Sequence, residues 1–290
     1  MFDCLLVQLL FSFSTPLNKL LLNHTTFIGL IAWRTGVAGL MMALIVLISR
    51  KRLPHLTNFH ILRLLGYKIV LGTYVKYMLK YWGLQYISAL HMALLINTTP
   101  LWAIFYEHVH FDNPFKKREI VGSVFVIVAS VLFFISNECT IPYIFCLDRL
   151  LPSCAIMIAV AAHAYGTSCT KELVAMHDFD PFVLSALSNL GAAFCAFLTG
   201  FFLHVSFEIQ QKAVFIPYFC LLILISNILG KRFHTMLLKK HSMTKLALAE
   251  NFSPVFVAGY SHFLLGQTII LQQWVAIFLM IFGLGVVRSK

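Results

Sequence analysis

Three lysines stand inside an apolar stretch of the chain, Tyr67–Trp82, which reads YKIVLGTYVKYMLKYW. Lys68, Lys76 and Lys80 recur every four or eight residues, so on a helix they share roughly one third of the circumference. An ammonium group attracts carboxylates and phosphates, and a charge placed within a membrane usually faces a cavity or a partner. The spacing therefore predicts a basic helix face that could hold an anion.

Each of these lysines also has a plainer explanation. Lys68 and Lys80 lie near the two ends of the stretch, where their long side chains could reach the polar interface of a membrane. Lys76 lies closest to the middle and is the strongest candidate for a residue that meets a substrate. Tyr74 and Tyr77 lie beside it and could shape the walls of such a site.

The composition of the chain indicates where this stretch must lie. The 290 residues are 60% hydrophobic and only 11% charged, with a mean hydropathy of +0.85. Soluble domains carry about 25% charged residues, so we expect an all-α polytopic membrane protein surrounded by the lipid bilayer. A bilayer core needs about 20 apolar residues per helix, which predicts ten transmembrane helices. They lie at about 4–22, 27–48, 64–86, 89–107, 119–136, 152–170, 181–204, 214–235, 243–264 and 271–287.

The net charge of +11 is explained by the loops rather than by a nucleic-acid partner. If the N-terminus is cytoplasmic, the outer loops hold only Arg149 and Lys212, and the other loop cations are inside. This bias follows the positive-inside rule and predicts that both termini are cytoplasmic. We expect an integral protein of the plasma (inner) membrane, either a monomer or a homodimer, with a small-molecule substrate.

The chain repeats itself with a fixed offset of 154 residues. Residues 88–113 align without a gap on residues 242–267, and an Asn-x-x-Pro motif begins at Asn97 in one copy and at Asn251 in the other. Chance similarity between apolar helices is the alternative, and the ungapped motif argues against it. Equivalent helices are five spans apart in chain order, and an odd offset inverts the second copy in the membrane. The repeat predicts two inverted five-helix halves, residues 1–136 and 152–287.

Short signatures in both copies resemble a known family. The second copy has Ser-Pro at 253–254, Leu-Gly-Gln at 265–267 and then Gln273, which is similar to the signature of the EamA-like family in the drug/metabolite transporter superfamily. The first copy matches it with Pro100 and Gly122. The resemblance covers essentially the whole chain, and it implies two five-helix halves, cytoplasmic termini and transport of a metabolite or drug.

Other positions bear on this resemblance. Arg34 stands where the family often carries an arginine in its second helix. Asn113 and Gln267 occupy places where the family usually has a glutamate, and Ala276 replaces a glycine. These departures weaken any inference about the motif itself but leave the expected fold unchanged.

Further polar residues complete the candidate site. The offset carries Tyr77 onto Lys231, so both halves place a basic group near the same turn of equivalent helices, although Lys231 could instead be a topogenic charge. Glu250 could neutralise a buried cation, couple transport to protons or contact a substrate amino group. Asn97 and Asn251 could bind a substrate or join helices. The predicted substrate-binding residues are Lys76, Lys80, Lys68, Arg34, Tyr74, Tyr77, Asn97, Lys231, Asn251 and Glu250.

These residues favour a secondary transporter of a small polar metabolite, anionic or zwitterionic, that works by alternating access between the two halves. An exporter of amino acids or drugs in the same fold is one alternative, and a membrane-embedded lipid-modifying enzyme is another. The sequence contains no nucleotide-binding P-loop, no HExxH motif and no Gly-x-Ser-x-Gly motif. We therefore expect no enzyme activity, no catalytic residue, no metal and no cofactor.

Overall fold

The computed structural model describes residues 2–50, 58–111, 147–241, 243–250 and 252–265, with single positions in 121–128 and 275–278. Within this part of the chain the regular secondary structure is entirely helical and contains no strand. The predicted spans at 119–136 and 271–287 lie almost wholly outside the described residues, so the number of ten remains a prediction.

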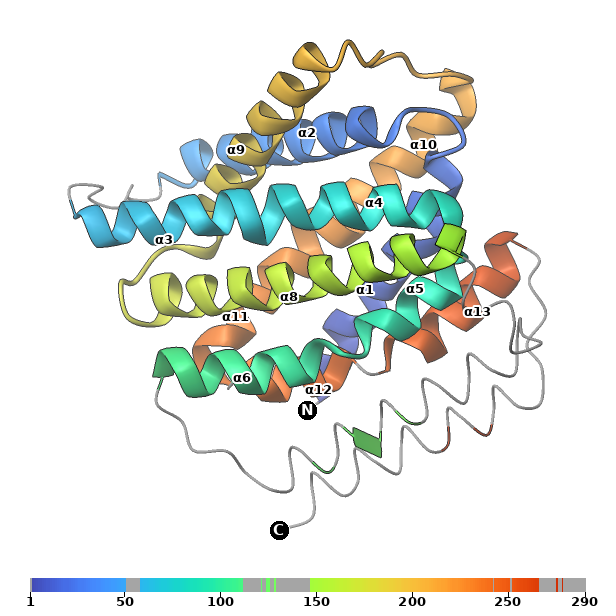
Figure 1. The fold of residues 1–290 in the computed structure, drawn as a ribbon. Helices are drawn as coiled ribbons and strands as arrows, with labels where there is room; N and C mark the ends of the chain where they lie inside the picture. Colours follow the sequence, from blue (N-terminus) through green and yellow to red (C-terminus); the bar gives the residue numbers. More distant parts are fainter. Residues whose placement is uncertain are drawn as a thin grey trace.

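The helices run largely side by side and form one bundle (Figure 1). The first part of the chain forms α1 (Phe2–Leu21), α2 (Phe27–Ile48), α3 (Phe59–Ile69), a π-helical segment (Val70–Val75), α4 (Lys76–Tyr86), α5 (Ala89–Ile96) and α6 (Thr99–Phe111). The later part forms α8 (Leu147–Ala175), α9 (Pro181–Phe202), α10 (Lys212–Leu222), a second π-helical segment (Ile223–Gly230), α11 (Lys231–Lys240), α12 (Met243–Glu250) and α13 (Ser253–Leu265).

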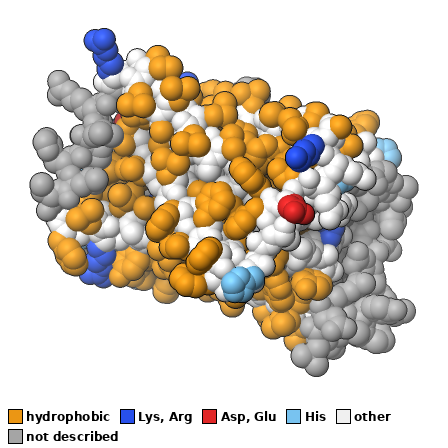
Figure 2. All heavy atoms as spheres, turned by 90° about the horizontal axis from the view of Figure 1, so that it is seen from above, with side chains coloured by type: hydrophobic (Ala, Val, Ile, Leu, Met, Phe, Trp, Pro, Cys, Tyr) orange, Lys and Arg blue, Asp and Glu red, His pale blue; other side chains and the backbone are white. Residues whose placement is uncertain are grey.

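The surface of the bundle and the lengths of its helices are those of a membrane protein. Hydrophobic side chains cover most of the described surface in Figure 2, and the few charged side chains in view lie to either side of this apolar area. A surface of this kind suits contact with lipid. The helices long and apolar enough to cross a membrane include Asp3–Leu21, Phe27–Ile48, Leu150–Ala175, Pro181–Phe202 and Lys212–Lys240. They overlap five of the predicted spans, although the spans predicted at 152–170 and 214–235 end five residues too early.

The helix boundaries repeat with the offset found in the sequence. α9 begins and ends 154 residues after α2, and the same holds for α12 after α5 and for α13 after α6. The two π-helical segments also lie at equivalent places, each between the two α-helical parts of a long helix. α2 and α9 pack against each other, so equivalent helices of the two copies meet in the bundle.

The predicted helices over 89–107 and 243–264 are not continuous, which corrects the expected spans. In the first copy the chain turns at Asn97-Thr98, and α6 begins at Thr99 with Pro100 in its first turn. Proline suits this position because its missing N–H would have no partner there. The hydroxyl of Thr98 donates to the Leu95 carbonyl at 2.8 Å and helps to end α5. The second copy breaks in the same place, before Ser253.

The third predicted span is longer and less regular than expected. The helix begins at Phe59 rather than near residue 64, because the side chain of Asn58 caps it by accepting from the His60 N–H. Between Val70 and Val75 the helix widens to the π form, and the Thr73 hydroxyl donates to the Lys68 carbonyl at 3.1 Å. Such π turns are rare and often accompany functional sites.

Gly72 in this segment and Gly166 in α8 allow two helix backbones to touch. A methyl group added at Gly166 would lie 2.3 Å from the Gly72 Cα, and one added at Gly72 would lie 2.6 Å from the Gly166 Cα. Real Cβ atoms do not approach backbone so closely, so either methyl would force the helices apart. The two glycines therefore set the distance between α8 and the helix that carries the lysines.

We expect the variant Gly166→Ala to be less stable by about 1–3 kcal/mol, as is usual for overpacking. Thermal melting of the purified protein in detergent measures this. Gly66→Ala is the matched control in α3, because its added methyl meets nothing within 4 Å. That control should keep or raise the melting temperature, since alanine favours a helix over glycine by roughly 0.5–1 kcal/mol. Equal melting of both variants would contradict the close contact.

Candidate functional site

A cavity of about 140 Å³ lies between the helices. This volume accommodates roughly ten water molecules or one small metabolite. Its walls come from α1, α2, the long helix α3–α4, both broken helices, α8, α9 and α11. The charged side chains that line it are Arg34, Lys68, Lys76, Lys80, Lys231 and Glu250, together with the imidazoles of His163 and His234. The described lining therefore has a large excess of positive charge.

The lysines differ in how firmly they are held. The Lys76 ammonium lies 3.3 Å from Nδ1 of His163, and Lys231 donates to the Asn189 amide oxygen at 2.5 Å. Lys68 and Lys80 make no hydrogen bond or ion pair to any residue that the structure describes. All four ammonium groups thus retain N–H donors that could bind a molecule in the cavity.

The ring of Tyr77 lies among three of the cations. Its centroid is 4.8 Å from the Lys76 nitrogen, 5.1 Å from the Arg34 guanidinium carbon and 5.9 Å from the Lys231 nitrogen. The negative face of an aromatic ring attracts cations at such distances. Tyr77 therefore reduces the mutual repulsion of groups that no carboxylate pairs with in the described part of the chain.

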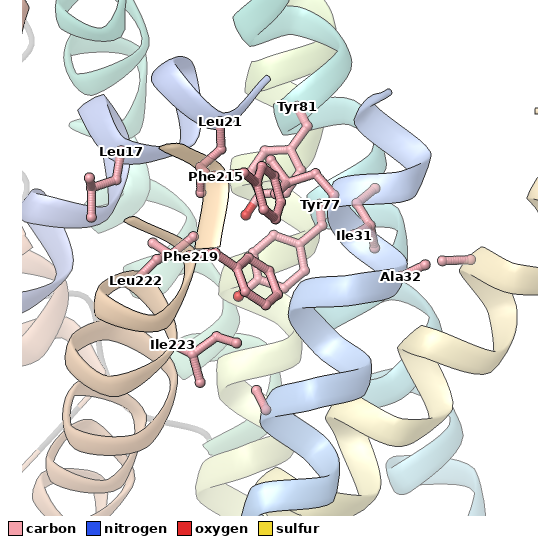
Figure 3. Packing of buried hydrophobic residues seen from close by; sticks show 13 residues of the cluster. Leu17, Leu21, Ile31, Ala32, Tyr77, Tyr81, Phe215, Phe219, Leu222 and Ile223 are labelled. Carbon is pink, nitrogen blue, oxygen red and sulfur yellow. The ribbon is translucent and has the colours of Figure 1, made fainter. Parts of the chain in front are cut away.

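Apolar packing fixes the position of Tyr77. Its ring stacks on that of Tyr81, with 5.4 Å between centroids, and both side chains are buried. Figure 3 shows the two tyrosines between Ile31 of α2 and the aromatic pair Phe215 and Phe219 of α10. Helices from both copies thus hold Tyr77 rigidly beside the cavity.

Arg34 joins four helices through neutral partners. Its Nε donates to Asn227 at 2.8 Å, Nη2 donates to Ser226 at 2.8 Å, and Nη1 donates to Asn18 at 3.0 Å and to the Tyr81 hydroxyl. A guanidinium has five N–H donors, so four of them are occupied. Arg34 lines the cavity, yet it has little capacity left to bind a substrate directly.

The two broken helices bring both positive and negative charge to the cavity. Thr99 and Ser253, at the first residues of α6 and α13, both line it, and their helix N-termini carry partial positive charge. Ser253 also accepts a hydrogen bond from Ser12 of α1 at 3.1 Å. Glu250 ends α12, and its carboxylate lies 3.9 Å from Nε2 of His234. Half-helix ends of this kind form substrate and ion sites in transporters.

Most of the residues predicted for the site line this cavity, and their role in binding stays a prediction. Tyr74 lies outside the lining, where its hydroxyl bonds to Thr199 of α9. Asn97 is buried at the turn between α5 and α6 and does not reach the cavity wall. Asn251 lies outside the described residues.

Sequence reasoning did not find several polar residues of the lining. They include Thr99, His163, Thr167, Ser185, Ser188 and Ser253. The repeat held a signal for some of them, because the offset of 154 carries Arg34 onto Ser188 and Thr99 onto Ser253. His163 and Thr167 belong to no motif or repeated pattern in the sequence, so no spacing marks them as functional.

Comparisons with known proteins agree with this architecture. Residues 2–135 and 150–289 each match the sequence model of the EamA-like transporter family. A solved structure described only as a crystal structure of a protein has the same fold, with a TM-score of 0.76 over 99% of this chain and 94% of its own. Its sequence identity is 12%, so this likeness shows the fold alone. No curated protein matches the chain by sequence.

Proposed function

The chain belongs to the EamA-like transporter family, and from this premise we propose that it is a secondary transporter of a small metabolite that carries negative charge. The observation that carries the proposal is the cavity, where five basic side chains face one carboxylate among the described lining residues. Desolvated charges of one sign repel each other, so a bound anion would stabilise the site. Lysine and arginine are the usual partners of carboxylates and phosphates.

The lysines are better placed than Arg34 to meet this anion. Four N–H groups of Arg34 already have partners, whereas Lys68 and Lys80 have none in the described part of the chain. The N-termini of α6 and α13 add further positive potential at the cavity wall. An anion would therefore contact Lys68, Lys76, Lys80 or Lys231, while Arg34 fixes the helices around it.

Transport would follow alternating access between two inverted five-helix halves, residues 1–136 and 152–287, of a ten-helix membrane protein. Both halves contribute cations to the cavity, so rocking of one half against the other would expose the same site to each side of the membrane in turn. The positive-inside bias supports cytoplasmic N- and C-termini in the plasma (inner) membrane. We expect a monomer or homodimer that acts without a cofactor.

The direct test begins with the purified protein in detergent. Thermal shift is measured with panels of organic phosphates, dicarboxylates, amino acids and hydrophobic cations, and the stabilising compounds are then offered in labelled form to proteoliposomes. We expect anions to stabilise the protein and to accumulate in the liposomes. Stabilisation by hydrophobic cations alone would contradict the proposal, and modification of lipid by the purified protein would support an enzyme instead.

Glu250 supports a second candidate, export of amino acids in the same fold. Its carboxylate lines the cavity and could accept the ammonium group of a zwitterion while a lysine binds the substrate carboxylate. We expect the variant Glu250→Gln to lose uptake of a zwitterion by about 10-fold or more, as removing one charged hydrogen bond costs roughly 1.5–3 kcal/mol. Uptake of a simple anion should be kept or improved, because the variant removes a negative charge from the cavity. Liposome uptake of matched amino and desamino acids distinguishes the two.

A further inference from the structure

A second group of polar side chains lies outside the cavity, where α3 begins and α8 ends. His60 is in the first turn of α3, Glu172 is in the last turn of α8, and His177 is in the loop that leads to α9. Nε2 of His60 lies 2.9 Å from Oε1 of Glu172, and the rings of His60 and His177 have centroids 6.1 Å apart. One possible ligand atom from each residue lies within 4.8 Å of the other two.

The three side chains offer the donors that zinc-like ions prefer. Two imidazole nitrogens and one carboxylate oxygen form a common three-ligand set for Zn²⁺, with water in the fourth position. A small movement of the two histidine side chains would bring the three ligand atoms to one ion, because His177 lies in a loop and His60 is on the protein surface. The exposure of His60, whose side chain is 56% accessible, also gives an ion a path from solvent.

The two described basic side chains that neighbour this group along the chain are directed elsewhere. Lys171, next to Glu172 in the chain, donates to Glu107 at 2.7 Å. Arg63, one turn after His60, donates to the Tyr67 hydroxyl at 3.2 Å. Among the residues that the structure describes, Glu172 is thus left to the two histidines, and its negative charge remains available to a cation.

We propose that His60, Glu172 and His177 bind a divalent transition metal ion, with Zn²⁺ as the best fit. The sequence predicts no metal site because no ligand motif joins residues that lie 112 positions apart. Neither Mg²⁺ nor Ca²⁺ fits well, because both prefer an all-oxygen shell.

The metal would join the two repeats of the chain. α3 belongs to the first segment that matches the family, residues 2–135, and Glu172 and His177 belong to the second, residues 150–289. A bound ion would therefore restrain movement between them at this end of the bundle. Only this consequence rests on the proposed transport mechanism, since the metal site itself requires no transport.

The test is a calorimetric titration with Zn²⁺ alone on full-length protein purified in detergent with a tag that contains no histidine and stripped with a chelator. We expect one ion per chain. The double variant His60→Ala/His177→Ala should weaken binding more than 10-fold, since even indirect partners of a metal ligand contribute about 10–100-fold to affinity. Glu172→Gln should also weaken it, and Mg²⁺ should give no binding heat.

His24→Ala/His204→Ala is the matched control, because it also removes two histidines. His24 lies before the start of α2 and His204 after the end of α9, whereas the proposed ligands lie beyond the other ends of these helices. Its Zn²⁺ affinity should equal that of the unaltered protein. Equal melting temperatures without metal would show that all variants are folded. The proposal is overturned if Zn²⁺ does not bind, if the His60/His177 variant binds as well as the unaltered protein, or if both double variants lose affinity equally. Since no substrate enters these measurements, their failure would leave the transport proposal standing.

Discussion

The variant Lys76→Met is expected to lower anion uptake into proteoliposomes by about 10- to 100-fold. Methionine keeps most of the length and apolar volume of lysine but removes the ammonium group that faces the cavity beside His163. A hydrogen bond to a charged group contributes roughly 1.5–3 kcal/mol, and each 1.4 kcal/mol is about tenfold in binding. The loss should appear in substrate affinity, and the protein should remain folded because it has one buried charge fewer.

Lys240→Met is the control for this result, because Lys240 is exposed at the end of α11, the helix that also carries Lys231. It makes the same chemical change without altering the cavity, so uptake should stay normal. Lys231→Met, with its ammonium near the same ring of Tyr77, should behave like Lys76→Met. Normal uptake by both cavity variants would show that the lysines are not part of the pathway.

The order and approximate positions of the long helices follow from the sequence, whereas their exact ends and their interruptions do not. The offset of 154 found at Asn97 and Asn251 reappears in the helix bounds. Pro100 indicates that a helix is disturbed, but whether the chain kinks or restarts depends on partners for the freed carbonyl groups. Here the hydroxyl of Thr99 donates to the Ile96 carbonyl at 2.5 Å. Because the Thr99 hydroxyl satisfies this carbonyl, the helix can end at Ile96 and restart at Thr99.

Those residues of the candidate site were predictable that carry a charge within an otherwise apolar segment. Lys76 and Glu250 stand out for this reason, since a charge within a membrane needs a polar environment. Tyr74 was expected to shape the wall because it stands close to Lys76 in the sequence, but two residues along a helix correspond to about 200° of rotation. Its hydroxyl therefore points away from the lysines and meets Thr199 of α9 instead. His163 carried no signal, because its relation to Lys76 arises only from the packing of α8 on α4.

Arg34→Met is expected to destabilise the protein in the absence of any substrate. The change leaves the amide oxygen of Asn227 and the hydroxyl of Ser226 without their donor, and each buried polar group left unpaired costs about 1–3 kcal/mol. Relief from burying a charge opposes this loss. Four hydrogen bonds and a contact with the Tyr77 ring are removed together, so we expect a net loss of at least about 2 kcal/mol.

Arg34→Lys separates the two possible roles of this residue. Lysine keeps the positive charge but lacks the planar fork that reaches Asn18, Asn227 and Ser226 at once. If Arg34 organises the helices, both variants should melt at a lower temperature without ligand, and Arg34→Lys should not restore the loss fully. If Arg34 instead binds the substrate, as its position in the sequence suggests, both variants should melt normally and lose only uptake. The hydrogen bonds of its guanidinium favour the first result, because only one N–H group remains for an anion.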